Sequence, residues 1–448
     1  MYDLLVATII VIIASALVLP FVQSKKVPYI TAAISAALAA YWAYSAFSMK
    51  FVSGTFIIDH LTEVVAIASL FAGAVIALSY GRLEGRSNIA SSMLLIGILG
   101  TILVASTLNP LVILASWGLL SIASYGIAAI PKDKKSLANS LKYAFMGCLS
   151  LQFLLIAIFL IFSGTLAAAA MLGFAILLVA TGFKVGAVPF HMWLPDVYGT
   201  SDPIAVSTLS AIMKLGPLAL VLRIMFYVTA GLSPKAVNTL LLIGIIIAVL
   251  TMTWGNVAAT VQGSVQKIMA YSSISHVGFI LMGLVVAMAS YYYGINYYFA
   301  LIGIFVYFFS YSISKTNAFT YIRGFSDRKL ESLRGAGLKY GANSAMFSLS
   351  LLNLLGLPPL LGFWGKLLIF MSASNPALSI FFIGPVPWFT IIAIINSVIS
   401  AFYYVKIIQQ IYADGNAQAD FSKLNSTIII SGLFLLIAGL VVPLILSI

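Results

Sequence analysis

The sequence has very little charge. Only 8% of its 448 residues are Asp, Glu, Lys or Arg, whereas 62% are hydrophobic, and the mean hydropathy is +1.11. Ordinary globular domains carry about 25% charged residues, because their surfaces face water. The composition therefore excludes a chain made mainly of soluble domains and predicts an all-α polytopic membrane protein.

The chain also has almost no cysteine. Cys148 is the only one, so this chain alone cannot supply an internal disulfide, a cysteine-based zinc cluster or an iron–sulfur cluster. We therefore expect no metal, no cofactor and no catalytic redox site in the chain itself. Residues 1–23 lack a basic segment and a small-residue cleavage site, which predicts a retained first span rather than a signal peptide.

What is present is a series of long apolar runs. With about 20 residues needed for each crossing, the runs predict about fourteen transmembrane helices. They are expected near 4–23, 27–48, 57–80, 89–108, 110–130, 141–163, 166–190, 203–229, 236–258, 268–289, 294–322, 343–374, 385–412 and 426–446.

Two of these runs are interrupted. The seventh runs into VPFHMWLPDVYGTSDP, and the twelfth is broken by GLPPLLGFWG. We expect two discontinuous helices, which are tolerated at membrane depth only where protein or water lines the irregular backbone. Breaks in two halves of the chain also suggest two five-helix repeats, 89–229 and 236–412, within a single integral membrane domain, 1–448.

The basic residues are unevenly distributed among the loops. The odd-numbered loops hold sixteen Lys and Arg, Lys132 among them, and the even-numbered loops hold two, Lys50 and Lys235. By the positive-inside rule, the odd loops are cytoplasmic and both termini lie outside a cell (cytoplasmic) membrane. The net charge of +12 is then a topology signal, so we predict contact with the lipid bilayer and no nucleic-acid partner.

Several basic residues fall inside the apolar runs. Lys184, Lys214 and Lys366 lie well within them, where an ammonium costs roughly 2.5–3.5 kcal/mol, so such residues usually face a protein interior or a wet cavity and serve ions or protons. A lysine near a helix end can instead reach the headgroups. Arg223 and Lys315 lie closer to their span ends, which favours that behaviour or an interfacial ion pair.

Histidine is a second candidate for proton transfer, because its pKa is near neutral. His191 lies at the mouth of the first broken helix, and His276 lies in the polar patch YSSISHVGF. Lys267 precedes His276 near a span end and would either load protons or act as a topology charge. The separation of the histidines and the missing acidic and cysteine companions argue against a metal site.

Three linked motifs resemble a known family. The runs FKVGAVPFHMWLPDVYGTSDPIAVSTLSAIMKLG, GNVAATVQGSVQKIMAYSSISHVGF and LLNLLGLPPLLGFWGK are similar, in order and spacing, to the proton-conducting module of antiporter-like subunits in respiratory complex I, multisubunit cation/proton antiporters and membrane-bound hydrogenases. The DVY and SSISHVGF motifs, the GFWGK ending and the absence of a long lateral helix most resemble the N-type subunit. The resemblance covers roughly residues 57–412.

The resemblance implies roles for particular residues. Lys184 and Lys366 match the family's lysines in the two broken helices, Lys214 matches the lysine that links them, and Lys267 and His276 match polar positions of the tenth span. The resemblance also implies that other membrane subunits are partners and that quinone and iron–sulfur clusters are bound by those partners. Together the lysines would form a polar axis that couples electron transfer elsewhere to proton movement.

One family residue is missing. The family pairs its first lysine with a glutamate in the fifth span, in the pattern Glu-Leu-x-Ser, but here Gly118 stands at that position and none of the eleven acidic residues lies in the span. Possible replacements are Glu63 and Asp59, one helical turn apart at the start of the third span, and Asp196 after the first broken helix. Alternatively, Lys184 would stay neutral or pair with a carboxylate of an adjacent subunit.

Four functions therefore remain open. The sequence favours a proton-translocating subunit of a complex I-like quinone oxidoreductase. The alternatives are a subunit of a cation/proton antiporter or membrane-bound hydrogenase, a structural spacer that does not pump, and a stand-alone secondary transporter.

Overall fold

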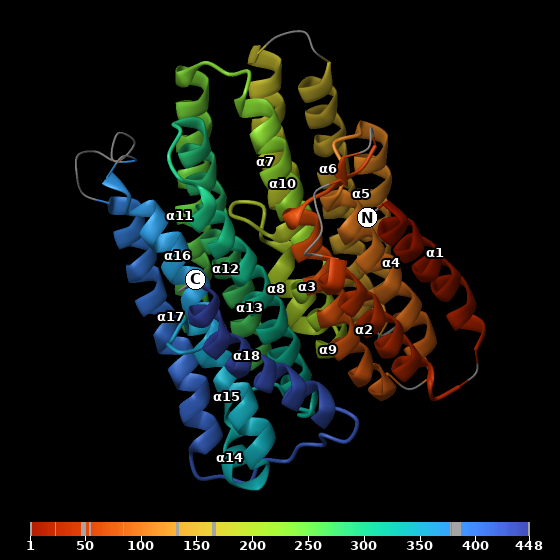
Figure 1. Cartoon of the computed structure of the whole chain (residues 1–448). Helices are drawn as coiled ribbons and strands as arrows, with labels where there is room; N and C mark the ends of the chain where they lie inside the picture. Colours follow the sequence, from red (N-terminus) through yellow and green to blue (C-terminus); the bar gives the residue numbers. More distant parts are fainter. Residues whose placement is uncertain are drawn as a thin grey trace.

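The computed structural model describes residues 2–22, 24–45, 51–52, 55–83, 85–130, 134–163, 167–376, 378 and 387–446, and these form a helical bundle (Figure 1). Thirteen helical stretches in the described part are long and apolar enough to cross a membrane. The expected all-α, multi-pass architecture is confirmed. The twelfth expected span, 343–374, accounts for the difference from fourteen, because it is divided into two helices that are each too short to cross alone.

The N-terminal half contains the first ten α-helices and a small hairpin. The elements are α1 (Tyr2–Val18), η1 (Leu19–Phe21), α2 (Val27–Ser45), β1 (Phe51–Val52), β2 (Ile57–Ile58), α3 (His60–Ser79), η2 (Tyr80–Arg82), α4 (Ser87–Ala105), α5 (Pro110–Ala128), α6 (Lys134–Phe162), α7 (Ala167–Val185), α8 (Trp193–Thr200), α9 (Pro203–Ala211) and α10 (Leu215–Thr229). The two strands are antiparallel, with Phe51 opposite Ile58 and Val52 opposite Ile57.

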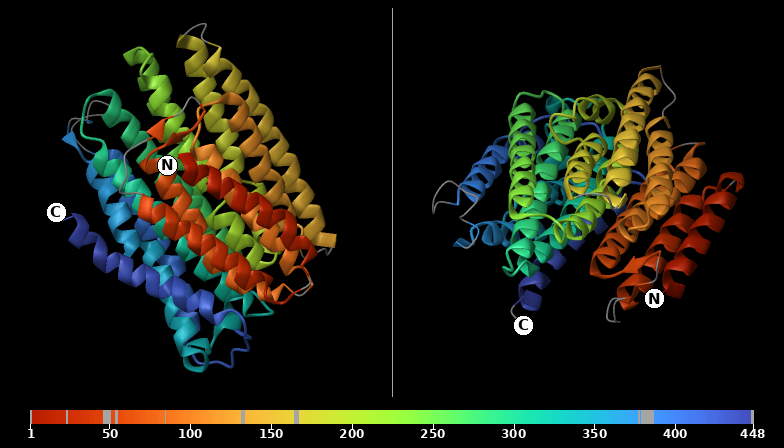
Figure 2. Two further views of the ribbon diagram at one scale, coloured as in Figure 1. Left: turned by 45° about the vertical axis from the view of Figure 1, so that its right-hand side comes forward. Right: turned by 90° about the horizontal axis from the view of Figure 1, so that it is seen from above.

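All the elements of the C-terminal half, within its described residues, are helices. Its elements are α11 (Pro234–Thr260), α12 (Val265–Tyr292), α13 (Tyr298–Arg323), η3 (Leu330–Leu333), α14 (Ala336–Lys339), α15 (Gly341–Leu355), α16 (Leu361–Ala373), α17 (Trp388–Tyr412) and α18 (Asn425–Leu446). Seen from above, the N-terminal helices lie at one end of the bundle and α17 at the other (Figure 2).

Capping residues explain where several helices begin. The side chains of Asp59, Asn109 and Asp202 accept hydrogen bonds from the first backbone N–H groups of α3, α5 and α9. Pro110 and Pro203 then occupy the first helical position, where no N–H is needed. These signals fix helix starts beside the regions that form the site.

Both expected breaks are present. Helix α7 ends at Val185 and α8 begins at Trp193, while α15 ends at Leu355 and α16 begins at Leu361. The first helix of each broken span, α7 or α15, is followed by a glycine with positive φ, +78° at Gly186 and +88° at Gly356. This left-handed conformation ends a helix at little cost only for glycine.

A third break was not predicted. The expected span 203–229 is divided into α9 and α10 by a turn at Ile212–Lys214. Pro217 follows by one helical turn and has no N–H to donate to the carbonyl of Met213, which favours an interruption there. Pro217 was therefore the available signal, and Lys214 lies at a helix junction rather than inside a continuous helix.

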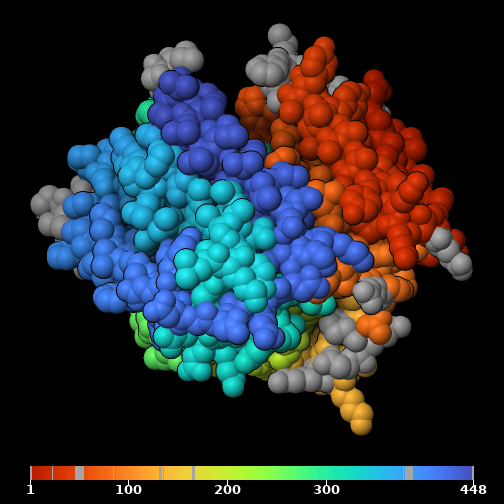
Figure 3. All heavy atoms as spheres, turned by 90° about the horizontal axis from the view of Figure 1, so that it is seen from below, coloured from red at the N-terminus to blue at the C-terminus, as the bar shows by residue number. Residues whose placement is uncertain are grey.

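Loops of the same parity meet at the same end of the bundle. On one face, Arg82 of the third loop pairs with Asp420 of the thirteenth at 2.5 Å. The segment containing α14 lies beside the chain that joins α17 to α18 (Figure 3), and Lys339 Nζ donates to Ala417 O there at 3.1 Å. Lys50, Lys132 and the expected span ends 46–48 and 385–386 lie outside the described residues.

Candidate functional site

Lys184 lies in the last turn of α7 and is 2% exposed. Its Nζ donates to Ser121 Oγ at 2.9 Å and to Ser124 Oγ at 3.4 Å, both on α5. The same nitrogen lies 5.1 Å from the ring centre of Tyr125 and 5.6 Å from that of Tyr143. Hydroxyl groups and aromatic faces therefore surround this ammonium. No carboxylate of the described chain forms an ion pair with it.

The position expected to hold a glutamate is empty space. A Cβ added at Gly118 would meet no other atom within 4 Å. Ser121 lies three residues further along α5, so it shares that side of the helix with Gly118. Ser121 thus lies beside the open position, and serine hydroxyls, rather than an acid, contact Lys184 from this helix.

The three candidate carboxylates are engaged elsewhere. Glu63 is buried and its Oε2 lies 3.0 Å from Nδ1 of the exposed His60. Asp196 is exposed on α8 and forms an ion pair with Lys142 of α6. Among the described residues, neither carboxylate forms an ion pair with Lys184.

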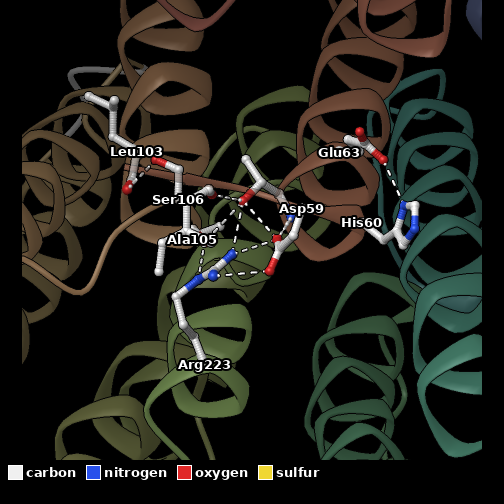
Figure 4. A network of polar contacts seen from close by, with 9 residues as sticks. Asp59, His60, Glu63, Leu103, Ala105, Ser106 and Arg223 are labelled. Carbon is white, nitrogen blue, oxygen red and sulfur yellow. Dashed lines mark hydrogen bonds and ion pairs between the residues drawn. The ribbon is translucent and has the colours of Figure 1, made fainter. Parts of the chain in front are cut away.

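Asp59, the third candidate, forms an ion pair with Arg223 of α10 (Figure 4). The guanidinium donates to both carboxylate oxygens, at 2.8 and 3.1 Å, to Thr62 Oγ1 at 2.9 Å and to Ala105 O at 2.7 Å. Partial burial raises the pKa of Asp59, but the charge and hydrogen bonds of Arg223, with those of Thr62, outweigh it and hold the pKa below its ordinary value of 3.8. Of the two expectations for Arg223, reaching the headgroups or forming an ion pair, the ion pair is the one observed.

Lys214 has a different environment. It is 2% exposed, and its Nζ has no hydrogen-bond partner within the described residues. The nitrogen lies 5.5 Å from the ring centre of Tyr198. Burying an amine that has no hydrogen-bond partner lowers the stability of the fold. Lys214 at the α9–α10 junction therefore indicates a functional rather than a stabilising role.

Lys366 lies on α16, beside the second main break. Its Nζ donates to the carbonyls of Leu354 and Leu355 at 3.0 and 2.9 Å, and lies 4.6 Å from the ring centre of Phe279. These carbonyls at the C-terminal end of α15 are free to accept because the helix stops there. A Cβ at Gly356 would lie 2.9 Å from Lys366 Cδ, so the absence of a side chain admits the lysine.

Both ring nitrogens of His276 contact tyrosine hydroxyls. Its Nδ1 lies 2.5 Å from Tyr307 Oη on α13, and its Nε2 lies 2.9 Å from Tyr404 Oη on α17. The ring is 2% exposed. The sequence motif SSISHVGF thus indicated a polar interior correctly, although its tyrosine partners are distant in the chain and could not be read from it.

The expectation for Lys315 was wrong. Its side chain is 0% exposed, and Nζ donates to Met269 O at 3.0 Å and to Ser272 Oγ at 2.8 Å, both on α12. It does not extend to the headgroups, because α13 carries its hydroxyl-rich stretch into the bundle. The preceding serines Ser312 and Ser314 were a signal for a polar inner face.

Two other predicted residues lie apart from these lysines. Lys267 is exposed in the first turn of α12. His191 lies in the break between α7 and α8, with its ring edge-on to Trp254 at 5.8 Å. Within the described residues, no group of three or more His, Cys, Asp or Glu side chains could hold a metal ion.

Comparisons with known proteins agree on one family. Residues 107–400 match the family model for NADH:quinone oxidoreductase/Mrp antiporter, TM. The chain is 30% identical over 400 residues to NADH-quinone oxidoreductase subunit N 2 of Acidobacterium capsulatum, covering 81% of this chain and 78% of that protein.

Two solved structures have a similar fold. A chain of respiratory complex I from Thermus thermophilus superposes with a TM-score of 0.82 at 25% identity, covering 99% of this chain and 98% of the other. A chain of the Mrp complex from Dietzia sp. gives 0.85 at 17% identity, covering 99% and 95%, which shows likeness of fold alone. The chain therefore belongs to the NADH:quinone oxidoreductase/Mrp antiporter transmembrane family, as an N-type antiporter-like subunit.

Proposed function

We propose that this chain translocates protons as a membrane subunit of a complex I-like quinone oxidoreductase. One observation carries the proposal: Lys184, Lys214, Lys315 and Lys366 are all buried in the bundle, and none of them forms an ion pair with a carboxylate of the described chain. Ionisable groups in such places are expensive and mark ion or proton pathways.

The surroundings of these lysines suit proton transfer. Three of the amines donate to hydroxyl or carbonyl oxygens, and the fourth, Lys214, has none of these partners in the described chain. An amine without a fixed counter-charge changes protonation state according to the water or charge that approaches it. Each lysine can thus accept a proton on Nζ and release it, with no change in covalent structure.

The remaining features of the proposal follow from the sequence and family. The chain lies in the cell membrane with both termini outside, and 89–229 and 236–412 act as two repeats, each containing a broken helix with a buried lysine. Quinone and iron–sulfur clusters belong to partner membrane and peripheral subunits. Electron transfer there drives proton movement along the lysines here.

The proposal is tested in the whole complex, purified and reconstituted into vesicles. Lys214→Ala and Lys366→Ala are expected to lower the number of protons translocated per electron, because each removes an amine from the axis. Lys142→Ala is the matched control, since that lysine is exposed and, among the described residues, pairs only with Asp196. Unchanged proton-to-electron ratios in both axis variants, with electron transfer intact, would contradict the proposal.

Two alternatives have specific support. The vacant Gly118 position favours a spacer that transmits coupling without pumping, and the unchanged ratios just described would establish it. The fold shared with the Mrp complex favours a subunit of an antiporter or hydrogenase. Co-purification with antiporter or hydrogenase subunits, rather than quinone-reducing ones, would identify that assignment. Purification without any other membrane subunit would indicate a stand-alone transporter.

A further inference from the structure

A chain of hydrogen bonds begins at the buried Lys315. Its Nζ lies 2.8 Å from Ser272 Oγ on α12, and that hydroxyl lies 2.5 Å from Tyr404 Oη on α17. All three side chains are 0% exposed. A cation on one helix is therefore joined through a second helix to a phenol on a third.

The chain continues without interruption through the histidine. Tyr404 Oη lies 2.9 Å from His276 Nε2, and His276 Nδ1 lies 2.5 Å from Tyr307 Oη. His276 and Tyr307 are each 2% exposed. The contacts thus connect five groups, and no gap between neighbours exceeds 2.9 Å.

We propose that Lys315, Ser272, Tyr404, His276 and Tyr307 form a proton-conducting path that crosses the C-terminal half of the bundle through side chains alone. It rests on the proposed function and deepens it, because it names the groups that carry protons between the buried lysines. Ser272, Tyr404 and Tyr307 are relay residues by this proposal, and Lys315 is the donor at one end.

The transfer balances in protons and charge. The Lys315 ammonium gives a proton to Ser272 Oγ, whose own proton passes to Tyr404 Oη, whose proton passes to His276 Nε2. One N–H bond breaks at the lysine and one forms at the imidazole, and both hydroxyls end as they began. His276 then releases its Nδ1 proton to Tyr307 Oη, and by this proposal the hydroxyl proton of Tyr307 ends on the neutral amine of Lys366, where a new N–H bond forms.

The far end of the path lies beside Lys366. Tyr307 packs against α16 at Gly365, where an added Cβ would lie 3.0 Å from Tyr307 Cδ2. Phe279 is shared as well: its ring centre lies 6.2 Å from that of His276 and 4.6 Å from Lys366 Nζ. The path therefore runs from Lys315 towards the lysine of the second broken helix.

The Lys315 end approaches the other half of the bundle. The lysine nitrogen lies 5.8 Å from the ring centre of Tyr311, whose hydroxyl lies 3.0 Å from Ser210 Oγ on α9. Lys214 follows Ser210 by four residues, at the α9–α10 junction. Lys315 thus lies between Lys214 and Lys366.

Tyr404→Phe tests the path at its middle. It removes one hydroxyl and keeps the ring, so Ser272 is cut off from His276. In the reconstituted complex we expect a lower proton-to-electron ratio. Tyr321→Phe is the matched control, because it removes an equally buried tyrosine–serine hydrogen bond, to Ser344 at 2.9 Å, that lies outside the path. A lower ratio in Tyr404→Phe than in Tyr321→Phe supports the path, and equal ratios overturn it.

A second pair of variants separates relay from packing. Ser272→Ala breaks the same link, whereas Ser272→Thr keeps a hydroxyl, so the ratio should fall in the first and recover in the second. If the complex with Tyr404→Phe fails to assemble, the two Ser272 variants still test the path. An alanine variant that pumps as well as the threonine variant would overturn the path.

Lys366→Ala, measured in parallel, distinguishes a failure of the proposed path from a failure of the proposed function. If Lys366→Ala lowers the ratio and Tyr404→Phe and Ser272→Ala do not, the path is wrong and the proposed function stands. If these three variants and Lys214→Ala all leave the ratio unchanged, the proposed function fails together with the path.

Discussion

The Nζ atom of Lys184 lies 2.9 Å from the hydroxyl of Ser121, one helical turn beyond Gly118 on α5. The amine therefore has a polar partner on the helix where an acidic one was expected. Hydroxyl groups share the lysine proton by hydrogen bonding but carry no counter-charge. Lys184 is accordingly the buried lysine whose environment departs most from the resemblance.

Gly118→Glu should fit and should couple to Lys184. The added Cβ meets nothing within 4 Å, and the carboxylate would share the side of α5 that carries Ser121. A double-mutant cycle with Lys184→Met, followed by thermal unfolding in detergent, is expected to give a coupling energy of roughly 0.5–3 kcal/mol. Gly100→Glu is the contrast, because its Cβ would lie 2.8 Å from Leu120 N and should disrupt folding. Additive effects of the two changes would show that position 118 does not face the lysine.

Lys214→Met and Lys315→Met should have opposite effects on stability. Removing the partnerless amine of Lys214 relieves a cost on the order of 1–3 kcal/mol, so its unfolding midpoint should hold or rise. Replacing Lys315 removes its hydrogen bonds to Met269 O and Ser272 Oγ, so its midpoint should fall. Differential scanning fluorimetry compares the two directly. A large loss of stability in Lys214→Met would indicate a structural role for that amine.

Asp59→Asn should be strongly destabilising. Asparagine still caps α3, so the change isolates the charge that holds Arg223. Breaking a buried ion pair costs about 3 kcal/mol, and somewhat less here because the Asp59 side chain is 26% exposed. Asp196→Asn is the control: it breaks an exposed pair with Lys142 and should change stability by less than about 1 kcal/mol. Similar losses in both variants would contradict the assignment.

The contribution of Asp59 should depend on pH in a defined direction. Although burial raises the pKa of Asp59, the Arg223 guanidinium and the hydrogen bonds lower it further, so the folded value lies below the ordinary 3.8. The stabilisation is then fully present above pH 3.8 and is lost as the pH falls through the folded pKa. The gap in unfolding midpoint between the parent protein and Asp59→Asn should stay constant from neutral pH to about pH 5 and close in stronger acid. A gap that closes near pH 6 would refute this.

Gly356→Ala should distort the second main break. The residue has φ of +88°, and an alanine Cβ would lie 2.9 Å from Lys366 Cδ. A side chain in this conformation costs about 1–3 kcal/mol, and the lysine must move as well, so both stability and proton translocation should decrease. Gly341→Ala, at the start of α15, meets nothing within 4 Å and should be neutral. Equal stability of the two variants would disprove the proposed fit around Lys366.

Much of the architecture was predictable because membrane helices follow a simple length rule. The two broken helices were visible as prolines inside apolar runs, and the burial of Lys184, Lys214 and Lys366 followed from their depth in those runs. The third break could also have been found from Pro217. Lys315 was misjudged because nearness to a span end says nothing about which side of a helix faces the bundle.

The sequence by itself determined that this is a multi-pass helical membrane protein, which residues are basic at depth, and that no acid lies on α5, since each of these depends only on local composition. Only the tertiary structure decided the partners: Ser121 for Lys184, Arg223 for Asp59, and Tyr307 and Tyr404 for His276. These partners lie on helices that are distant in the chain. Their pairing depends on how each helix is rotated and packed, which local hydropathy does not specify.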